Sequence, residues 1–232
     1  MTTRIGVDVG GTFTDLIFFD DETSDVIDVK VLTTSKRPDE GAVEAVRRAL
    51  TTKQIRNSEY FLHGTTVGLN SLLERRGAKV GLLATQGFRD ILEIRRGSRL
   101  PKDPLFWRQP EPLVPRELRL SINGRIFADG SIHAPLNTED VRQAIDLFER
   151  EDVTSIAVAF MNAYANPKHE LEAEQIIREC GFKGGISLSH RLSREYREFE
   201  RTSTVVIDAF VRGQVSEYVK RLDQHLDDLG FV

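Results

Sequence analysis

Cysteine, long apolar runs and a cleavable leader are scarce or missing in this sequence. Cys180 is the single cysteine of the 232 residues, so an internal disulfide is excluded, and we expect it to be a small core residue in the reducing cytoplasm. No apolar stretch approaches the roughly 18 residues that a membrane span needs, and no basic start leads into an apolar run. The sequence therefore indicates neither export nor membrane insertion.

An excess of positive charge is also missing. The chain has 32 Lys and Arg against 36 Asp and Glu, a net charge of −4, and the two signs are interspersed. A sequence-independent nucleic-acid binder needs a basic face, so this class is disfavoured. With 40% hydrophobic and 29% charged residues, the chain is typical of a globular protein with one large or two small domains.

The common nucleotide motifs GxxxxGK[ST] and GxGxxG are absent, so a nucleotide would need another device. The opening of the chain offers one. Two short runs rich in β-formers, 4–9 and 16–20, flank Gly10 and Gly11, which predicts a tight hairpin. Glycine permits positive φ and leaves no Cβ beside a ligand, so several N–H groups can converge on a phosphate.

Polar side chains surround the glycine pair. Thr12 and Thr14 add hydroxyl donors, and Asp8 and Asp15 bracket the turn. A carboxylate beside bound phosphates commonly holds a hydrated Mg²⁺. The hypothesis is a nucleotide-phosphate hairpin, and the alternative is an ordinary glycine turn between two strands.

The string DVGGTFTD, from Asp8 to Asp15, resembles the first phosphate loop of the actin, sugar-kinase and heat-shock-cognate ATPase superfamily. In particular it resembles the start of the hydantoinase A, 5-oxoprolinase and ketone-carboxylase family. The pattern around it agrees. Residues 26–33 alternate as a third strand, and Pro38 opens a helix to about Leu50. The resemblance implies an α/β fold, the N-terminal part of an actin/sugar-kinase-like (ribonuclease H-like) nucleotide domain with a mixed sheet and flanking helices.

A second informative stretch runs from Tyr60 to Gly77. A short strand leads into His63, Gly64, Thr65 and Thr66, and a helix is predicted to follow and to end at Gly77. From the pattern alone, the threonines could simply cap this helix, whose N-terminus attracts anions, and His63 could be a strand-end histidine. The string HGTTVGLNSLLERRG resembles a signature of the hydantoinase A family. The resemblance implies that His63 to Thr66 are active-site residues.

Two polar pairs further along resemble family positions. Arg89 and Asp90 lie in GFRDILEI, and Glu198 and Arg201 precede an apolar run. The resemblance implies substrate contacts for all four. From the residues alone, each pair could equally be an exposed ion pair, which contributes little.

The remaining pattern alternates between strands and helices, as expected of an α/β protein. The expected elements are a strand over 79–85, a short helix over 87–94, a proline-rich loop over 101–115, a hairpin around Asn123-Gly124, a helix over 137–151, a strand over 154–161, a helix from 166 to Gly181, a strand over 186–190, a helical stretch from Ser193 with an apolar stripe at Val215, Val219, Leu222, Leu226 and Leu229, and the start of a strand at 231–232.

The resemblance implies an N-terminal family domain over 1–183 and the beginning of a second, truncated domain over 184–232. It also implies an enzyme that uses ATP and Mg²⁺ to phosphorylate a cyclic amide or a ketone enolate before ring-opening hydrolysis or carboxylation. Gly10, Gly11, Thr12, Thr14 and Gly64 would bind the nucleotide, Asp8 would position Mg²⁺, and Asp8, Asp15, His63, Thr65 and Thr66 would be catalytic.

The expected partners are the small-molecule substrate and a hydantoinase B-type subunit or domain, with no nucleic acid and no membrane. Two alternatives remain open. One is a small-molecule kinase of the same superfamily, and the other is a non-catalytic fragment or subunit that needs a partner with the missing half of the nucleotide cleft.

Overall fold

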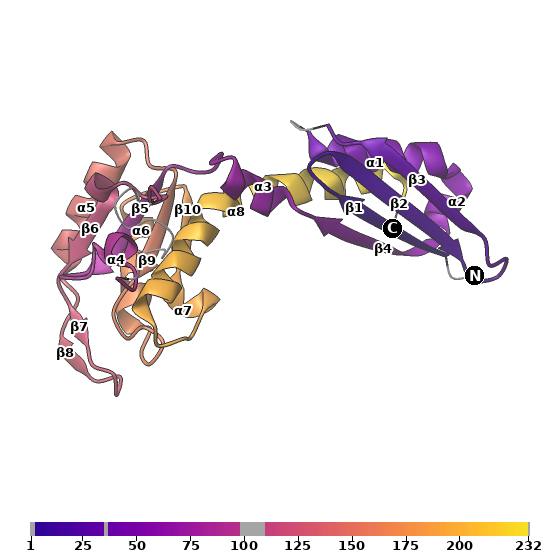
Figure 1. The fold of residues 1–232 in the computed structure, drawn as a ribbon. Coiled ribbons are helices and arrows are strands. Elements are labelled where there is room, and N and C mark those ends of the chain that lie inside the picture. The colour runs from indigo at the N-terminus through magenta and orange to yellow at the C-terminus, as the bar shows by residue number, and fades with distance from the viewer. Residues whose placement is uncertain (1–2, 35–36, 98–109, 232) are drawn as a thin grey trace. The chain divides into compact units, whose positions relative to one another are not determined.

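The computed structural model of the protein describes residues 3–34, 37–97 and 110–231, and these form two compact units (Figure 1). Unit 1 comprises residues 1–76 and 213–232, and unit 2 comprises residues 77–212. Each unit has its own sheet, and no helix among the described residues is long and apolar enough to cross a membrane. The division expected at 183/184 concerns family regions rather than contacts, so it stays a prediction.

Unit 1 is a mixed sheet covered by helices. Its elements are β1 (Thr3–Val9), β2 (Phe13–Asp20), β3 (Val26–Leu32), α1 (Pro38–Ala49), α2 (Thr52–Arg56), β4 (Ser58–Thr65), α3 (Val67–Leu73) and the last part of α8 (Glu198–Leu229). The strand order is β3-β2-β1-β4, with β1 antiparallel to β2 and parallel to β4. The predicted opening, three strands followed by a helix, is confirmed.

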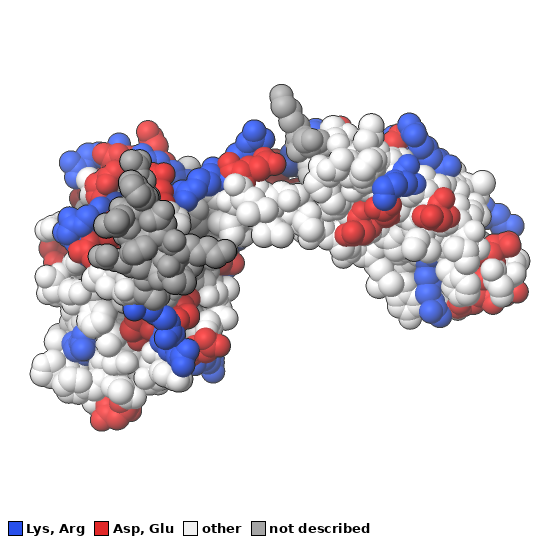
Figure 2. Space-filling view, in the orientation of Figure 1, with Lys and Arg blue, Asp and Glu red and all other residues white. Residues whose placement is uncertain are grey.

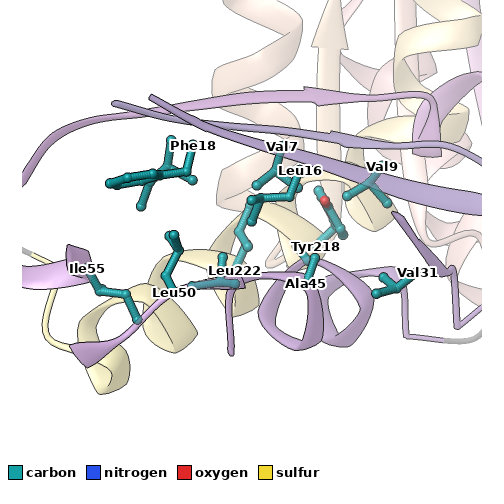
Figure 3. Close-up of a cluster of buried hydrophobic side chains, with 13 residues drawn as sticks. Val7, Val9, Leu16, Phe18, Val31, Ala45, Leu50, Ile55, Tyr218 and Leu222 are labelled. Carbon is teal, nitrogen blue, oxygen red and sulfur yellow. The ribbon is translucent and has the colours of Figure 1, made fainter. Parts of the chain in front are cut away.

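The core of unit 1 lies on one face of this sheet. Strand residues alternate, so that Ile5, Val7 and Val9 of β1 are buried while Arg4 and Asp8 are exposed. Figure 3 shows the buried side chains of the strands against those of α1, α2 and α8, including Tyr218 and Leu222. The opposite face of the sheet, which carries Asp8, is left open.

Unit 2 is a parallel α/β unit. Its elements are β5 (Val80–Thr85), α4 (Ile91–Ile94), the 3₁₀ helix η1 (Arg116–Leu118), β6 (Arg119–Ile122), β7 (Arg125–Ile126), β8 (Ile132–Ala134), α5 (Thr138–Arg150), β9 (Ser155–Ala159), α6 (Lys168–Glu179), β10 (Gly185–Leu188), α7 (Ser189–Leu192) and the first part of α8. The sheet order is β10-β9-β5-β6 with all neighbours parallel, and β7 and β8 form a separate ribbon.

Several predicted boundaries were wrong. Asn123-Gly124 does not turn a hairpin, because β6 pairs with β5 and β7 pairs with β8; the reversal lies at Asp129-Gly130 instead. Helix α3 ends at Leu73, and the left-handed residue after it is Arg75 rather than Gly77. Phe231 is outside any strand and packs edge-on against Phe61.

The remaining elements expected from the sequence are present, except that the helical stretch expected from Ser193 begins at Glu198, since residues 193–197 form neither helix nor strand. Of the proline-rich loop, residues 101–109 lie outside the described part of the chain, and Pro110 to Pro115 form neither helix nor strand. The predicted strand over 186–190 ends at Leu188, where α7 begins.

Candidate functional site: the glycine turn of unit 1

The turn between β1 and β2 lies beside the carboxyl end of β4. Asp8 of β1 pairs with Asp15 of β2 on one side and with Gly64 of β4 on the other. Because side chains alternate across a strand, the two carboxylates share the open face of the sheet with the bare backbone of Gly64. Residues distant in sequence therefore meet at one edge, as the hairpin hypothesis expects.

Gly64 leaves room for the carboxylate of Asp8. A Cβ at Gly64 would lie 2.9 Å from Asp8 Oδ1, closer than real Cβ contacts. No ion-pair partner is found for Asp8 in the described part of the chain, whereas Asp15 Oδ1 accepts a 2.6 Å hydrogen bond from Lys30 Nζ. Of the two predicted carboxylates, Asp8 is thus the one whose charge is uncompensated.

The glycine turn is open to a ligand. Gly10 N–H donates to Phe13 O at 3.0 Å and closes the turn, and the N–H groups of Gly11 and Thr12 have no acceptor among the described residues. Neither Gly10 nor Gly11 has a positive φ, so the expectation that glycine is used for its conformational freedom was wrong. Glycine is needed for close approach instead, since a Cβ on Gly11 would lie 3.1 Å from Asn70 Nδ2.

The two threonines of the turn have different surroundings. Thr12 is exposed, whereas Thr14 is fully buried, with its hydroxyl 2.9 Å from Thr33 Oγ1. A Cβ at Gly41 of α1 would lie 3.1 Å from Thr14 Oγ1, so this hydroxyl is packed against the helix. The structure therefore corrects the expected role of Thr14: it joins β2 to the core and does not present a donor on the open face.

Thr65 and Thr66 connect β4 to α3. Thr65 Oγ1 accepts from the N–H of Val67, the first residue of the helix, at 3.2 Å, whereas the N-cap residue Thr66 makes no side-chain cap bond. Thr66 Oγ1 accepts from Asn70 Nδ2 at 3.1 Å, and Thr66 N–H donates to Val9 O. Both threonines are exposed, and Asn70 packs against Gly11, so the glycine turn and the start of α3 are held together.

His63 lies on the other face of the sheet. It is half-buried beside Phe61, and Tyr218 Oη of α8 lies 2.7 Å from its Nε2. Burial lowers the pKa of His63, an effect that the backbone of Val7 and the charge of Asp8 oppose. Burial raises the pKa of Tyr218 to about 12, so Tyr218 donates and a neutral His63 accepts. The geometry thus places His63 behind the turn, as a support of β4.

The other four predicted site residues belong to unit 2. Asp90 pairs with Arg116 at 3.0 and 3.1 Å, which lowers the pKa of Asp90, while Arg89 lies 3.8 Å from it. Arg201 is fully buried and donates to Phe160 O, Glu195 O and Ser189 Oγ as well as to Glu198.

The contacts of Arg89, Asp90, Glu198 and Arg201 therefore lie within unit 2 and stabilise its fold. Desolvation raises the pKa of Glu198, although the paired Arg201 opposes this. The predicted substrate role of these residues stays a prediction.

Sequence reasoning missed three features: the contact of Asn70 with the turn, the role of Tyr218 beside His63, and the buried carboxylate of Asp39. Asp39 of α1 is fully buried among Arg37, Arg221 and His225, at 3.1, 3.7 and 3.3 Å. Although burial raises its pKa, the hydrogen bond and charge of Arg37 outweigh burial and lower it. Pro38 followed by Asp39 and Glu40 signalled only a helix start.

Comparison with known proteins shows the family of the chain. The family model described as the hydantoinase/oxoprolinase N-terminal region matches residues 4–181. The chain belongs to the hydantoinase/oxoprolinase family. It is 35% identical to caprolactamase subunit alpha of Pseudomonas jessenii, over 98% of this chain and 34% of that protein. It is also 32% identical to the acetophenone carboxylase gamma subunit of Aromatoleum aromaticum, over 90% of this chain and 31% of that protein.

A solved structure supports the fold class. The crystal structure of ATP-dependent caprolactamase from Pseudomonas jessenii matches with a TM-score of 0.89 and 35% identity, over 98% of this chain and 34% of that one. The predicted α/β fold with a mixed sheet and flanking helices is confirmed. The chain spans about a third of the length of these relatives.

Proposed function

We propose that this hydantoinase/oxoprolinase-type chain holds the phosphates of ATP at the glycine turn, in an enzyme that activates a cyclic amide for ring-opening hydrolysis. The observation that carries the proposal is the open turn itself: two N–H groups for which the described residues offer no acceptor lie beside the carboxylate of Asp8, for which they offer no ion-pair partner. Backbone N–H groups bind phosphate oxygens well, and fixed donors stabilise the charge that develops during phosphoryl transfer. The caprolactamase relative is named as ATP-dependent, which supports ATP here.

Mg²⁺ fits this arrangement. Magnesium is usually held by one or two carboxylates together with substrate phosphates and water, and Asp8 offers one exposed carboxylate without a competing cation. No group of three or more His, Cys, Asp or Glu able to hold a metal is found among the described residues, so an all-protein metal cage is not part of the proposal. When bound, the ion would neutralise charge on the phosphates.

In the proposed reaction the amide oxygen bonds to the γ-phosphorus of ATP as the bond to ADP breaks. One water then adds to the activated carbon, the C–N bond breaks and the nitrogen takes a proton, which leaves an acyl phosphate. A second water hydrolyses this acyl phosphate to the free carboxylate and phosphate. Gly11 and Thr12 would hold phosphate oxygens through their N–H groups, and Asp8 would hold Mg²⁺, which would supply charge neutralisation there. Thr66 and Asn70 keep the turn in place. His63 and Tyr218 act from behind, by fixing the strand that carries Gly64.

Carboxylation of a ketone is the second candidate, because a relative at 32% identity is named as an acetophenone carboxylase subunit. A requirement for bicarbonate would distinguish it. Several relatives are named as subunits, which supports a partner subunit, and we propose that this partner is of the hydantoinase B type. A non-catalytic role for this chain alone also stays open, since it spans a third of those relatives.

The test is Gly64→Ala, measured by MgATP titration of the ¹⁵N-labelled chain. In the unchanged chain the amide signals of Gly11 and Thr12 should shift. The new Cβ displaces the Asp8 carboxylate, so MgATP affinity should fall about tenfold, the scale of one lost charge-assisted contact.

Gly6→Ala is the matched control. Gly6 lies on the same face of β1, and its added Cβ would meet only Ile17 O at an ordinary 3.8 Å, so affinity should not change. Signals of Gly11 and Thr12 that stay still under saturating MgATP would overturn the proposal.

A further inference from the structure

A hollow of about 390 Å³ lies in unit 1 beside the glycine turn. Gly10 and Gly11 line one side, Asn70 of α3 lines another, and Gln214 and Tyr218 of α8 complete it. Small-molecule sites commonly have volumes of about 300–1,000 Å³. The hollow therefore has the size of a ligand site, and it shares the backbone of the turn that the proposed function assigns to phosphate.

The charges in this hollow are balanced. Arg76 pairs with Glu74 at 3.0 Å, and Arg221 pairs with Glu217 at 3.0 Å, and all four residues line the hollow. Sites for phosphate or carboxylate present cations that are free to form charge-assisted hydrogen bonds. Because each cation here already faces a carboxylate, an anion would gain little, and a neutral ligand is favoured.

Two neutral amides line the same hollow. Asn70 donates through Nδ2 to Thr66 Oγ1, which leaves its Oδ1 as an acceptor. Ser71 Oγ contacts both Val67 O and Gln214 Oε1, so one end of the Gln214 amide is held and the other end is available. A carboxamide group both donates and accepts, and it matches a ligand that does the same on adjacent atoms.

We propose that this hollow is the subsite for the neutral cyclic amide, whose C=O and N–H bind Gln214 and Asn70 beside Gly10 and Gly11. The inference rests on the proposed function for the reaction that follows binding, but binding itself needs no nucleotide. A substrate seated here has its oxygen next to the backbone that would hold the transferred phosphate. Asn70 then has two roles, since it contacts both the turn and the ligand.

The experiment titrates the ¹⁵N-labelled chain with 2-pyrrolidinone in the absence of nucleotide. Signals of Asn70, Ser71 and Gln214 should shift, including the side-chain amides. Cyclopentanone, which has the carbonyl but lacks the N–H, should bind several-fold more weakly, and inorganic phosphate should leave the signals of Ser71 and Gln214 unchanged. Shifts that are absent from these residues, or equal for the ketone and the lactam, would overturn the inference.

The matched variants are Gln214→Leu and Gln224→Leu. Both glutamines are exposed residues of α8 in unit 1, and only Gln214 lines the hollow. Gln214→Leu should weaken 2-pyrrolidinone binding about tenfold, the scale of one lost hydrogen bond, while Gln224→Leu should leave it unchanged. Equal affinities for the two variants would count against the assignment of Gln214, and the shifts in the unchanged chain test the site independently of either variant.

The subsite and the proposed function fail in different ways. If 2-pyrrolidinone shifts Asn70 and Gln214 while MgATP leaves Gly11 and Thr12 unchanged, the subsite stands and the ATP site falls. If MgATP shifts the turn while 2-pyrrolidinone leaves the hollow unchanged, the subsite falls alone.

Discussion

At the scale of single residues, the contact between His63 and Tyr218 has a consequence for stability. Burial lowers the pKa of His63 in the folded protein below its ordinary value of about 6.5, so the unfolded chain binds the proton more readily. The stability contributed by neutral His63 is therefore fully present above pH 6.5. It is lost as the pH falls through the lowered pKa.

We expect unfolding by urea to require less denaturant at pH 5.5 than at pH 7.5, and His63→Gln to reduce this difference. His169 of unit 2 also has a pKa lowered by burial, so part of the pH dependence should remain. Circular dichroism of both proteins at the two pH values measures the effect. An unchanged pH dependence in His63→Gln would show that His63 carries a proton equally well when folded.

The candidate site could be predicted in part from single residues. Asp8, Gly11 and Gly64 were singled out by their types and by resemblance, but the register that sets Asp8 beside Gly64 is a long-range pairing that no local pattern contains. Thr14 is different. Because side chains alternate along a strand, placing Asp15 on the open face implies that its neighbour Thr14 faces the core. The buried position of Thr14 could therefore have been predicted from the sequence.

At the scale of elements, the two faces of the sheet in unit 1 differ sharply. Large apolar residues are exposed on the open face, and Ile17 of β2 is 55% exposed whereas its neighbour Phe18 is 1% exposed. Figure 2 shows charged side chains interspersed among uncharged ones over this unit. Tyr60 and Leu62 of β4 are exposed on the same face as Ile17. The exposed apolar residues of this face therefore form a group and are not scattered singly over the surface.

Paired substitutions on β2 test which face carries the core. Phe18→Ala should lower the free energy of unfolding by about 3–5 kcal/mol, because it removes a fully buried ring from the cluster in Figure 3. Ile17→Thr keeps a β-branched residue and should change it by about 0.5 kcal/mol or less. Urea unfolding followed by circular dichroism compares the two. Similar losses from both would mean that the open face is also packed.

Elements with a clear period were predictable, whereas those set by tertiary contacts were not. The Asn123-Gly124 pair suggested a hairpin, but Asp140 of α5 binds both the backbone N–H and the side chain of Asn123 at 2.8 Å. The stripe of α8 was only partly right. Val219 is 51% exposed, and Tyr218 together with Leu222 faces the core, four residues apart as one helix face requires.

At the scale of the whole molecule, the two units have separate sheets, and α8 contributes residues to both. This division could not be predicted from the order of elements, because the segment 213–232 returns to the unit formed by the first 76 residues. The helical pattern of α8 is continuous, so it does not indicate the boundary between the two units at residues 212 and 213. The family match over residues 4–181 crosses both units, so it does not define the division either.

The buried network of unit 2 offers a test of that division. Glu170 of α6 is fully buried and accepts from Phe160 N–H, Ser189 Oγ and His190 N–H, at 3.0, 2.5 and 3.0 Å. Arg201 of α8 donates to Ser189 Oγ and Phe160 O. The network therefore joins α6, the residue that follows β9, α7 and α8 within one unit.

Arg201→Met keeps much of the side-chain volume but leaves the partly buried Glu198 without its cation. Removing one partner of a buried ion pair costs about 3–5 kcal/mol, so unit 2 should open more often while unit 1, which has its own core, should not. Amide hydrogen exchange should therefore speed up in β5 and β9 and stay slow in β1 and β2. Arg194→Met, at an exposed arginine nearby, should change neither unit. Equal acceleration in both sheets would show that the two units unfold as one, because α8 would then couple their stabilities more strongly than their separate cores allow.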